Sequence, residues 1–581
     1  MQAHRPNSNS NRKMNARKPS FPHATNDMWN KRRITLDYGA GKGNELELLV
    51  PGHAVMIKSR GFKDKPTIEN PPAVIEEELR IQLFPKNSLV PRSLLVLIPD
   101  NTRPPTSARA GLHALLSILA DPELRPEKTT ILAGGGTHKP MSEQELREFL
   151  GAELFERLKA CAKEYNITIG KDGLPIMQHD WKDENSLKKF NTSFEGRNVV
   201  MSANKLLFEH EALLNIADVD LHPYMGASGS IYKMCIVGVG GPENIYLTHS
   251  PSLLLDEATY PGRITGNRFF NAVKEAALSL FEAMRREGML RYEPLSVNLV
   301  CEHGEKTRVV DVLVGPAAQK WEESADIVFT SYTGMIDRGV HIIIGGVDKG
   351  KDQALDQGAR LIDFFIRLHD PHGNPILLGE TLHRVAILFT PCSKAEYSGG
   401  IATPSSFKHL EKLREIVNAN IDQINSEISR MSDAREAQAK IHDFKQRVLD
   451  SWEAYLNQVY EAERGFGGGG QRALRMLYIM RNFGLFIVGT PNRKVVDYLA
   501  QISPPVKLHP EAQRSFEQAR VDPLLLGVKG VLLRNGRKNE DAMSAVDVAV
   551  RYFEWARGGD PIEPEIVIVP NMHILPKRAH R

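Results

Sequence analysis

The stretch SLLVLIPDNTRPPTSARAGLHALLSILADPELRPEKTTILAGGGTH, residues 93–138, decides the fold class. Its apolar runs at 93–100 and 129–134 have the length of buried strands, and residues 107–121 between them carry apolar side chains at helical spacing. Strand, helix and strand in this order form a βαβ unit. The sequence therefore predicts an α/β protein with a mainly parallel sheet.

A second set of strand candidates begins near residue 295. Its members are VNLVCEH, TRVVDVLVG, VHIIIGGVD, RVAILFTPC, LFIVGT, GVLL and EIVIVP. The simplest partition joins two domains near residues 275–295. We expect two α/β, Rossmann-like domains with a cleft between them, the first spanning 34–285 and the second spanning 290–400 together with 470–581.

Residues 404–466 interrupt the second domain with a different pattern. Apolar residues recur at threes and fours from Leu410 to Met431 and again from Ile441 to Val459, and the glycine run GFGGGG follows at 465–470. This pattern predicts one long amphipathic helix or a helical hairpin. The insertion either packs on its own chain or makes a subunit contact that forms a homo-oligomer, and the sequence leaves both open.

Composition limits the classes of function. A chain of 581 residues is too long for a single core, and 41% hydrophobic residues suffice for globular packing. The net charge of +3 provides no overall field for a nucleic acid or a membrane. Residues 1–33 are the exception, because eight Lys and Arg face one Asp among polar residues, and we expect a disordered basic arm there.

Neither a membrane span nor a disulfide framework is expected. No apolar run reaches the roughly 18 residues of a span. The four cysteines lie far apart without zinc-site spacing, which is typical of a cytoplasmic protein.

Polar residues follow the predicted strands of the first domain, where ligands bind in sheets of this kind. Asp100 and Arg103 follow the first strand, with Pro104 and Pro105 fixing the exit of the chain. A fixed guanidinium suits a substrate carboxylate, although a turn pair of Asp and Arg is the simpler reading of this segment alone. His138 follows the next strand after three glycines and can act as a general base or a metal ligand.

The third loop of this kind lies at 217–250, in ADVDLHPYMGASGSIYKMCIVGVGGPENIYLTHS. His222 follows an apolar segment, and the Gly/Ser run after it could hold an anion through its amides. Lys233 offers an amine that can form a covalent bond, and His249 precedes a predicted helix start. Three polar loops after strands of one domain indicate a binding or catalytic site.

These segments resemble the nickel-pincer-nucleotide-dependent lactate racemase family. The resemblance rests on DNTRPP, GGGTHKPMSEQELREFLG, QHDWKDENSL, HPYMGASGSIYK and THS in this order, and continues through IIIGGVDKGKDQA, GGQRALR and EIVIVPNMHILP. It covers most of residues 90–581. It leaves the basic arm and the 404–466 helix as additions.

The resemblance implies a cofactor and a set of roles. The family binds nickel through pyridinium-3-thioamide-5-thiocarboxylic acid mononucleotide, which is attached to a lysine, here Lys233 in the loop that contains Ser228 and Gly229. His249 is then the nickel ligand, and His138 and His222 are the paired acid/base residues. The substrate, a small 2-hydroxy acid, is implied to contact Arg103, Asp100 and Gln353, and the enzymes that synthesise the cofactor are implied partners.

The implied chemistry agrees with the residues. Hydride transfer to an electron-poor ring avoids removing a weakly acidic C–H proton. A flat 2-keto acid can accept the hydride on either face, so a histidine on each face is what racemisation needs. Sulfur donors with an imidazole suit nickel.

The sequence also departs from the family pattern. An ungapped count from His222 puts Tyr232 where the anchoring lysine belongs, and one inserted residue would restore Lys233. A family lysine three residues after the glutamine falls on Asp356, which indicates a substrate other than lactate unless Lys349 or Lys351 takes its place.

The polar cluster of His179, Asp180, Asp183 and Glu184 either braces the loops or caps a helix. Three hypotheses for the whole chain follow. It is a 2-hydroxy acid racemase or epimerase, a diverged oxidoreductase or lyase that uses the same hydride step, or a noncatalytic nucleotide-binding or assembly protein. We favour the first.

Overall fold

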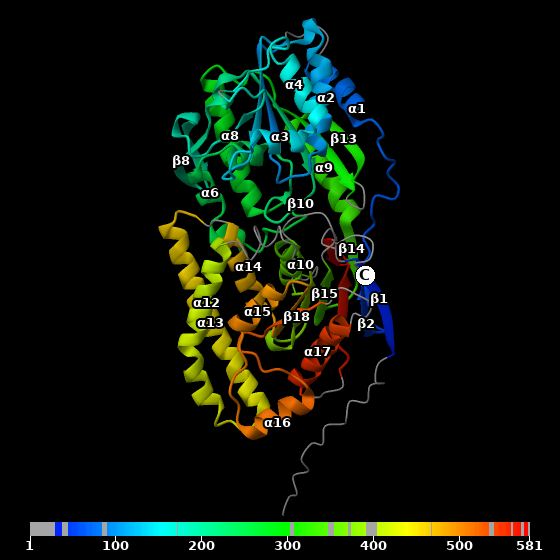
Figure 1. Ribbon diagram of the computed structural model, residues 1–581, viewed down its shortest axis with the longest axis vertical. Helices are drawn as coiled ribbons and strands as arrows, with labels where there is room; N and C mark the ends of the chain where they lie inside the picture. Colours follow the sequence, from blue (N-terminus) through cyan, green and yellow to red (C-terminus); the bar gives the residue numbers. More distant parts are fainter. Residues whose placement is uncertain are drawn as a thin grey trace, which may run out of the picture.

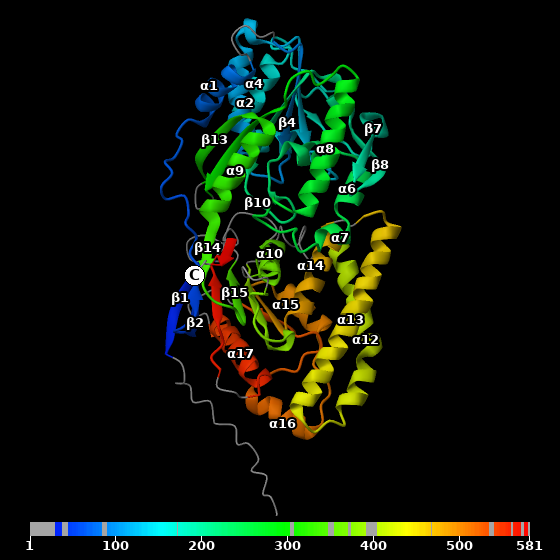
Figure 2. The same ribbon diagram turned by 180° about the vertical axis from the view of Figure 1, so that it is seen from behind.

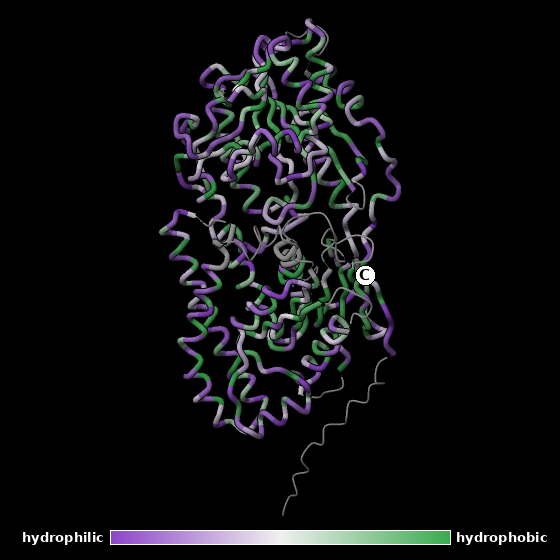
Figure 3. Tube along the Cα trace, viewed as in Figure 1, coloured by the Kyte–Doolittle hydropathy of each residue, from purple (hydrophilic) through white to green (hydrophobic). Residues whose placement is uncertain are grey.

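The computed structural model describes residues 30–37, 45–83, 90–170, 172–302, 307–346, 354–369, 374–390, 404–465, 468–533, 540–558, 562–570 and 575–578. Two α/β domains follow one another along the longest axis of the molecule (Figure 1). Each contains a six-stranded sheet, and the residues in and around the sheets are the most hydrophobic part of each domain (Figure 3). The predicted α/β class is confirmed.

The sheet of the first domain is parallel except at one edge. Its order is β13 (Arg308–Pro316), β12 (Leu295–Glu302), β9 (Ala212–Val219), β4 (Ser93–Pro99), β5 (Lys128–Gly134) and β6 (Met177–Gln178), with β13 antiparallel to β12. On β4, Leu94, Val96 and Ile98 join the core under one set of helices, while Leu95 and Leu97 join the core on the opposite face. This alternation is the period of two of a strand buried on both faces.

Helices cover both faces of this sheet (Figures 1 and 2). One face carries α1 (Pro71–Leu83), α2 (Thr106–Leu119) and α4 (Ala152–Cys161), with α3 (Glu143–Leu150) beside α4. The other carries α8 (Arg268–Arg286) and α9 (Ala317–Tyr332). The hairpin of β7 (Leu187–Phe194) and β8 (Arg197–Asn204) lies against α8.

The second sheet is parallel throughout. Its order is β18 (Val528–Leu532), β17 (Leu485–Thr490), β16 (Val385–Phe389), β15 (Ile342–Gly346), β19 (Ile566–Val569) and β3 (Val55–Met56). One face packs on α17 (Glu540–Ala556), and the other packs toward α10 (Ala354–Arg367) and α14 (Gly468–Asn482). Other elements at its periphery are α15 (Arg493–Ile502), α16 (Pro510–Ala519) and the strand pair β14 (Thr333–Ile336) with β20 (Leu575–Arg578).

The domain boundaries differ from the expected ones at two places. The strands β12 and β13 were expected in the second domain, but β12 is hydrogen-bonded in parallel to β9, so the first domain runs through α9. Helix α8 is the crossover that returns the chain to the same sheet, as parallel pairing requires. The strand β3 joins the second sheet instead of the first.

The expected basic arm is also shorter than predicted. Residues 31–33 belong to β1 (Lys31–Asp37), which pairs with β2 (Glu45–Pro51), and the apolar side chains of this pair pack in the core under α17. Residues 1–29 lie outside the described residues. The alternating apolar residues of 34–50 therefore place Lys31, Arg32 and Arg33 in a strand, although these three residues are basic.

The insertion is a helical hairpin of α12 (Pro404–Ile428) and α13 (Ala434–Ala462). Its two helices pack on each other, since Trp452 is fully buried and its indole N–H donates to the carbonyl of His409 at 3.0 Å. Both helices also pack on α14 of the same chain. The hairpin also contacts the first domain, where Tyr460 stacks on Tyr246 at 4.8 Å between ring centroids. In the described part of the chain, none of the helices is long and apolar enough to cross a membrane.

Candidate active site

The candidate residues lie at the carboxyl ends of β4, β5 and β9, which are neighbours in the first sheet. Asp100 follows β4, His138 follows β5, and the loop at 220–230 follows β9. Parallel strands end at the same edge of a sheet, so these three loops converge there.

Asp100 and His138 form a pair across two loops. The Oδ2 atom of Asp100 lies 2.7 Å from Nδ1 of His138, and Thr102 Oγ1 donates to the other carboxylate oxygen at 2.6 Å. Burial tends to raise the pKa of Asp100, but the hydrogen bond from His138 and that from Thr102 hold it below its ordinary value. An ionised Asp100 fixes the ring proton of His138 on Nδ1 and leaves Nε2 available. Asp100 therefore orients His138.

Arg103 lies at the mouth of the same loop. Its side chain is exposed and donates to the backbone carbonyl of Thr102 at 3.4 Å. An exposed guanidinium on a loop closed by two prolines can receive a carboxylate from solvent.

His222 and Lys233 meet across the loop that follows β9. Nζ of Lys233 lies 2.9 Å from Nε2 of His222, and Nδ1 of His222 accepts the backbone N–H groups of Tyr224 and Met225 at 3.2 and 3.1 Å. Because Nδ1 is occupied by two donors, His222 exchanges protons through Nε2. The amine of Lys233 and Nε2 of His222 therefore lie in direct contact in the candidate site.

Tyr232 points elsewhere. The short helix α5 (Ile231–Lys233) begins at Ser230, whose hydroxyl accepts from the N–H of Tyr232 at 3.2 Å. The ring of Tyr232 is buried against Phe270 and Phe281 of α8, at 6.4 Å between centroids in both cases. Adjacent residues of a helix point about 100° apart, which explains why only Lys233 faces His222.

The residues Ser228 and Gly229 shape this loop. The hydroxyl of Ser228 accepts from the N–H of Asp220 at 3.0 Å, and the carbonyl of Ser228 accepts the indole N–H of Trp321 on α9 at 2.7 Å. Gly229 has φ +83°, and a Cβ there would lie 2.9 Å from the carbonyl oxygen of Asp218. Both residues therefore stabilise the loop that presents His222 and Lys233.

His249 lies at the end of α6 (Pro242–Thr248), before α7 (Pro251–Leu254). Its Nδ1 lies 2.9 Å from the hydroxyl of Thr248, which donates its own proton to the carbonyl of Asn244 at 2.7 Å. The hydroxyl must then accept from Nδ1–H, so the lone pair of the neutral ring is on Nε2. Burial, with a smaller contribution from the charge on Lys233, lowers the pKa of His249 to about 4.

Tyr224 connects the two histidines and was missed in the sequence. Its ring is edge-on to His222 at 5.9 Å and to His249 at 6.2 Å between centroids. The signal was its place directly after the His-Pro pair of the loop. Arg475 of α14 also reaches this ring, with Nη2 donating to the phenol oxygen at 2.6 Å.

The cluster at 179–184 separates into two roles. His179 is buried, with Nε2 at 3.0 Å from the carbonyl of Gly240 and Nδ1 at 3.3 Å from Asn204, so it braces the turn that leads into α6. Asp183 caps a short 3-10 helix by accepting from the N–H of Asn185 at 3.1 Å. Glu184 is exposed.

The remaining predicted substrate contacts come from residues 349–356. Gln353, Lys349 and Lys351 lie outside the described residues, as does the side chain of Asp356. Within the described ranges, no group of three or more His, Cys, Asp or Glu side chains is arranged to hold a metal ion.

Comparison with known proteins gives one family match. Residues 54–260 match the model of the lactate racemase N-terminal domain. No curated protein matches the chain. Among solved structures, the fold is similar to the lactate racemase apoprotein from Thermoanaerobacterium thermosaccharolyticum, with a TM-score of 0.61, 14% identity, and 94% of this chain and 100% of that chain covered. A protein from Thermotoga maritima gives a TM-score of 0.48 at 14% identity, over 88% of this chain and 99% of that one.

Proposed function

We propose that this chain, whose residues 54–260 match the lactate racemase N-terminal domain, racemises or epimerises a 2-hydroxy acid with a nickel-pincer nucleotide. The observation that carries the proposal is the 2.9 Å contact between Lys233 and His222, with Tyr224 linking His222 to His249. A nucleophilic amine, a proton-exchanging imidazole and an imidazole with a free lone pair gather at one sheet edge.

These residues fit the cofactor that the family implies. Lys233 would hold the nucleotide through its amine, and His249 would supply the one protein ligand to nickel through Nε2. The donor set of a soft sulfur ligand with one imidazole needs no cluster of protein ligands. Thr248 prepares His249 for this role, because a hydrogen bond at Nδ1 fixes the ring and raises the basicity of the other nitrogen.

When bound, such a cofactor supplies an electron-poor ring that accepts a hydride and returns it. The protein's residues would bind the substrate and move its hydroxyl proton. Arg103 binds the carboxylate of the 2-hydroxy acid. His138, held by Asp100 through Nδ1, takes the hydroxyl proton with Nε2, and His222 performs the same task with its own Nε2 on the opposite face of the substrate.

The test is racemisation by protein coexpressed with the cofactor biosynthesis enzymes in nickel-containing medium. A panel of single-enantiomer 2-hydroxy acids is incubated with the protein in D2O, and chiral chromatography with mass spectrometry follows the enantiomer ratio and the hydrogen on carbon 2. We expect at least one acid to racemise while it keeps that hydrogen, because hydride transfer does not exchange it with solvent.

Matched variants assign the acid/base roles. We expect His138→Gln and His222→Gln each to slow the reaction about 100-fold or more, as for loss of a general acid/base. His113→Gln is the control, because His113 is a half-buried residue in the middle of α2 and not in the loops that carry the candidate residues, and we expect this variant to keep full activity. Incorporation of solvent deuterium at carbon 2, or an unchanged enantiomer ratio for every acid with loaded protein, contradicts the proposal.

A further inference from the structure

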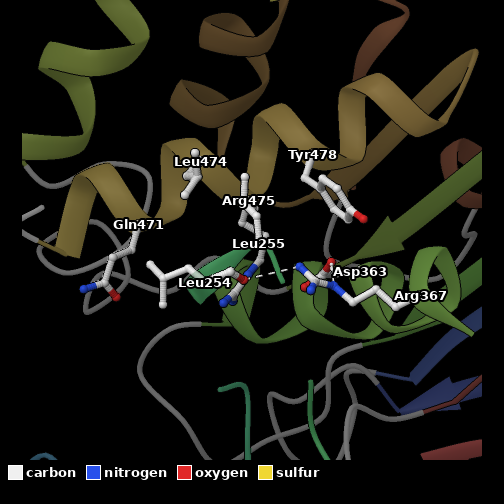
Figure 4. Close-up of a pocket in the computed structure, with 8 residues that line it drawn as sticks. All are labelled: Leu254, Leu255, Asp363, Arg367, Gln471, Leu474, Arg475 and Tyr478. Carbon is white, nitrogen blue, oxygen red and sulfur yellow. Dashed lines mark hydrogen bonds and ion pairs between the residues drawn. The ribbon is translucent and has the colours of Figure 1, made fainter. Parts of the chain in front are cut away.

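Among the described residues of the second domain, Arg475 contacts a side chain of the candidate site. Arg475 projects from α14 toward the Leu254–Leu255 end of α7, beside a pocket between the two domains (Figure 4). Arg475 is only 5% exposed, and its Nη2 donates to the phenol oxygen of Tyr224 at 2.6 Å. A buried, charge-assisted hydrogen bond of this kind orients its acceptor firmly.

Tyr224 transmits this contact to both histidines. Its ring is edge-on to His222 and to His249, at interplanar angles of 69° and 85°. Its backbone N–H donates to Nδ1 of His222, and its carbonyl accepts from Asn267 at 2.8 Å. A movement of the Tyr224 ring therefore changes the packing of both imidazoles.

Arg367 of α10 makes a second contact between the domains in this pocket. Its guanidinium pairs with Asp363 at 2.8 Å and donates to the backbone carbonyls of Leu254 and Asp256 in the first domain. This contact joins the domains through the backbone and touches neither histidine. Arg475 differs because its acceptor is a side chain of the site.

We propose that Arg475 is a positioning residue that sets the orientation of His222 and His249 through Tyr224, so that these two imidazoles reach their working geometry only when the second domain is seated on the first. The catalytic meaning of this inference rests on the proposed function. The contact itself can be tested without activity.

The first test is NMR of ¹³C-histidine-labelled protein without cofactor, at one pH. The ring signals of His222 and His249 are assigned with His222→Gln and His249→Gln. We expect Arg475→Met and Tyr224→Phe to displace both signals, because the ring current of residue 224 acts on both imidazoles. Arg475→Lys, which keeps one donor, is expected to restore part of the wild-type positions. Unchanged signals in folded Arg475→Met overturn the proposal.

Arg481→Met is the matched control. Arg481 lies on the same helix, but its guanidinium pairs with Asp450 and Glu453 of α13, away from the site. We expect this variant to leave both histidine signals in place. If Arg475→Met does not fold by circular dichroism, Tyr224→Phe carries the test, since it removes the same hydrogen bond and keeps the aromatic ring.

The second test uses loaded enzyme. We expect Arg475→Met to lower kcat about tenfold with a smaller change in KM, since misplaced catalytic groups slow the chemical step. In the Tyr224→Phe background, Arg475→Met should cause little further loss, because both changes break one interaction. Multiplicative losses overturn the proposal. Wild-type protein that is loaded but does not racemise would contradict the proposed function, and the NMR result would still decide the role of Arg475.

Discussion

Nζ of Lys233 lies 2.9 Å from Nε2 of His222, while the neighbouring Tyr232 is buried against α8. The count of residues from His222 left two candidates for the anchoring position, and the short helix α5 directs only one of them to the site. The proposed anchor and one proposed acid/base residue thus lie in direct contact.

Replacing Lys233 is expected to abolish cofactor attachment without unfolding the protein. Lys233→Ala, coexpressed with the cofactor biosynthesis enzymes, should carry no added mass and less than about a tenth of the nickel of the wild type, because the covalent bond is lost. Intact-protein mass spectrometry and metal analysis measure both. Tyr232→Phe is the control and should load normally; loading of Lys233→Ala would assign the anchor to another residue.

Thr248 is expected to tune the nickel ligand. Thr248→Val keeps the shape of the side chain but removes the acceptor for Nδ1–H of His249, and loss of such an outer partner weakens metal binding about 10- to 100-fold. Competition with a chelator measures nickel retention in the loaded protein. Thr259→Val is the control because that buried threonine lies beyond α7. Equal retention in wild type and Thr248→Val would contradict the role.

Asp100 is expected to act through His138. In Asp100→Asn, the side chain no longer favours the tautomer with the proton on Nδ1, so kcat should fall about 100-fold while KM changes little. Steady-state kinetics measure the two constants separately. Asp183→Asn, at the cap of the short 3-10 helix, should leave kcat unchanged. A rise in KM alone would mean that Asp100 contacts substrate instead.

Asp218 gives a pH dependence of stability. Burial raises its pKa to about 6, against hydrogen bonds such as that from Ser107 at 2.7 Å. A raised pKa means that the folded state binds the proton more tightly. The stabilisation that proton binding at Asp218 gives the folded state is therefore complete below the ordinary pKa near 3.8. It is lost as the pH rises through about 6.

The variant Asp218→Asn should consequently gain stability relative to the wild type as the pH increases. Urea unfolding at pH 5 and pH 8 should show the difference in free energy of unfolding growing in favour of Asn by about 1.4 kcal/mol, since about one pKa unit of the shift lies above pH 5. Asp326→Asn on the exposed side of α9 should show no such growth. If the difference in free energy of unfolding between Asp218→Asn and the wild type is the same at pH 5 and pH 8, the raised pKa of Asp218 is contradicted.

The fold class and the edge of the sheet that carries the site could be predicted from the sequence. The continuous apolar run of β4 predicts a strand that is buried on both faces, and its side chains do alternate between two cores. The polar residues after β4, β5 and β9 lie at one edge because neighbouring parallel strands end there. These features are local or follow from the geometry of parallel sheets.

Long-range pairing was harder to predict. Whether β12 belongs to the first or the second sheet depends on its hydrogen bonds to β9, some 80 residues earlier, and its apolar pattern suits either sheet. The same holds for β3, which pairs with β19 near the other end of the chain. The hydrogen bond from Arg475 to Tyr224 joins residues 251 positions apart, and no local sequence pattern predicts such a contact.

The most direct test of the central claim is intact-protein and peptide mass spectrometry with nickel analysis of the wild-type chain, coexpressed with the cofactor biosynthesis enzymes. We predict an added mass on the peptide that contains Lys233, with close to one nickel per chain. An unmodified Lys233 peptide without nickel, while a lactate racemase control loads under the same conditions, would contradict the account.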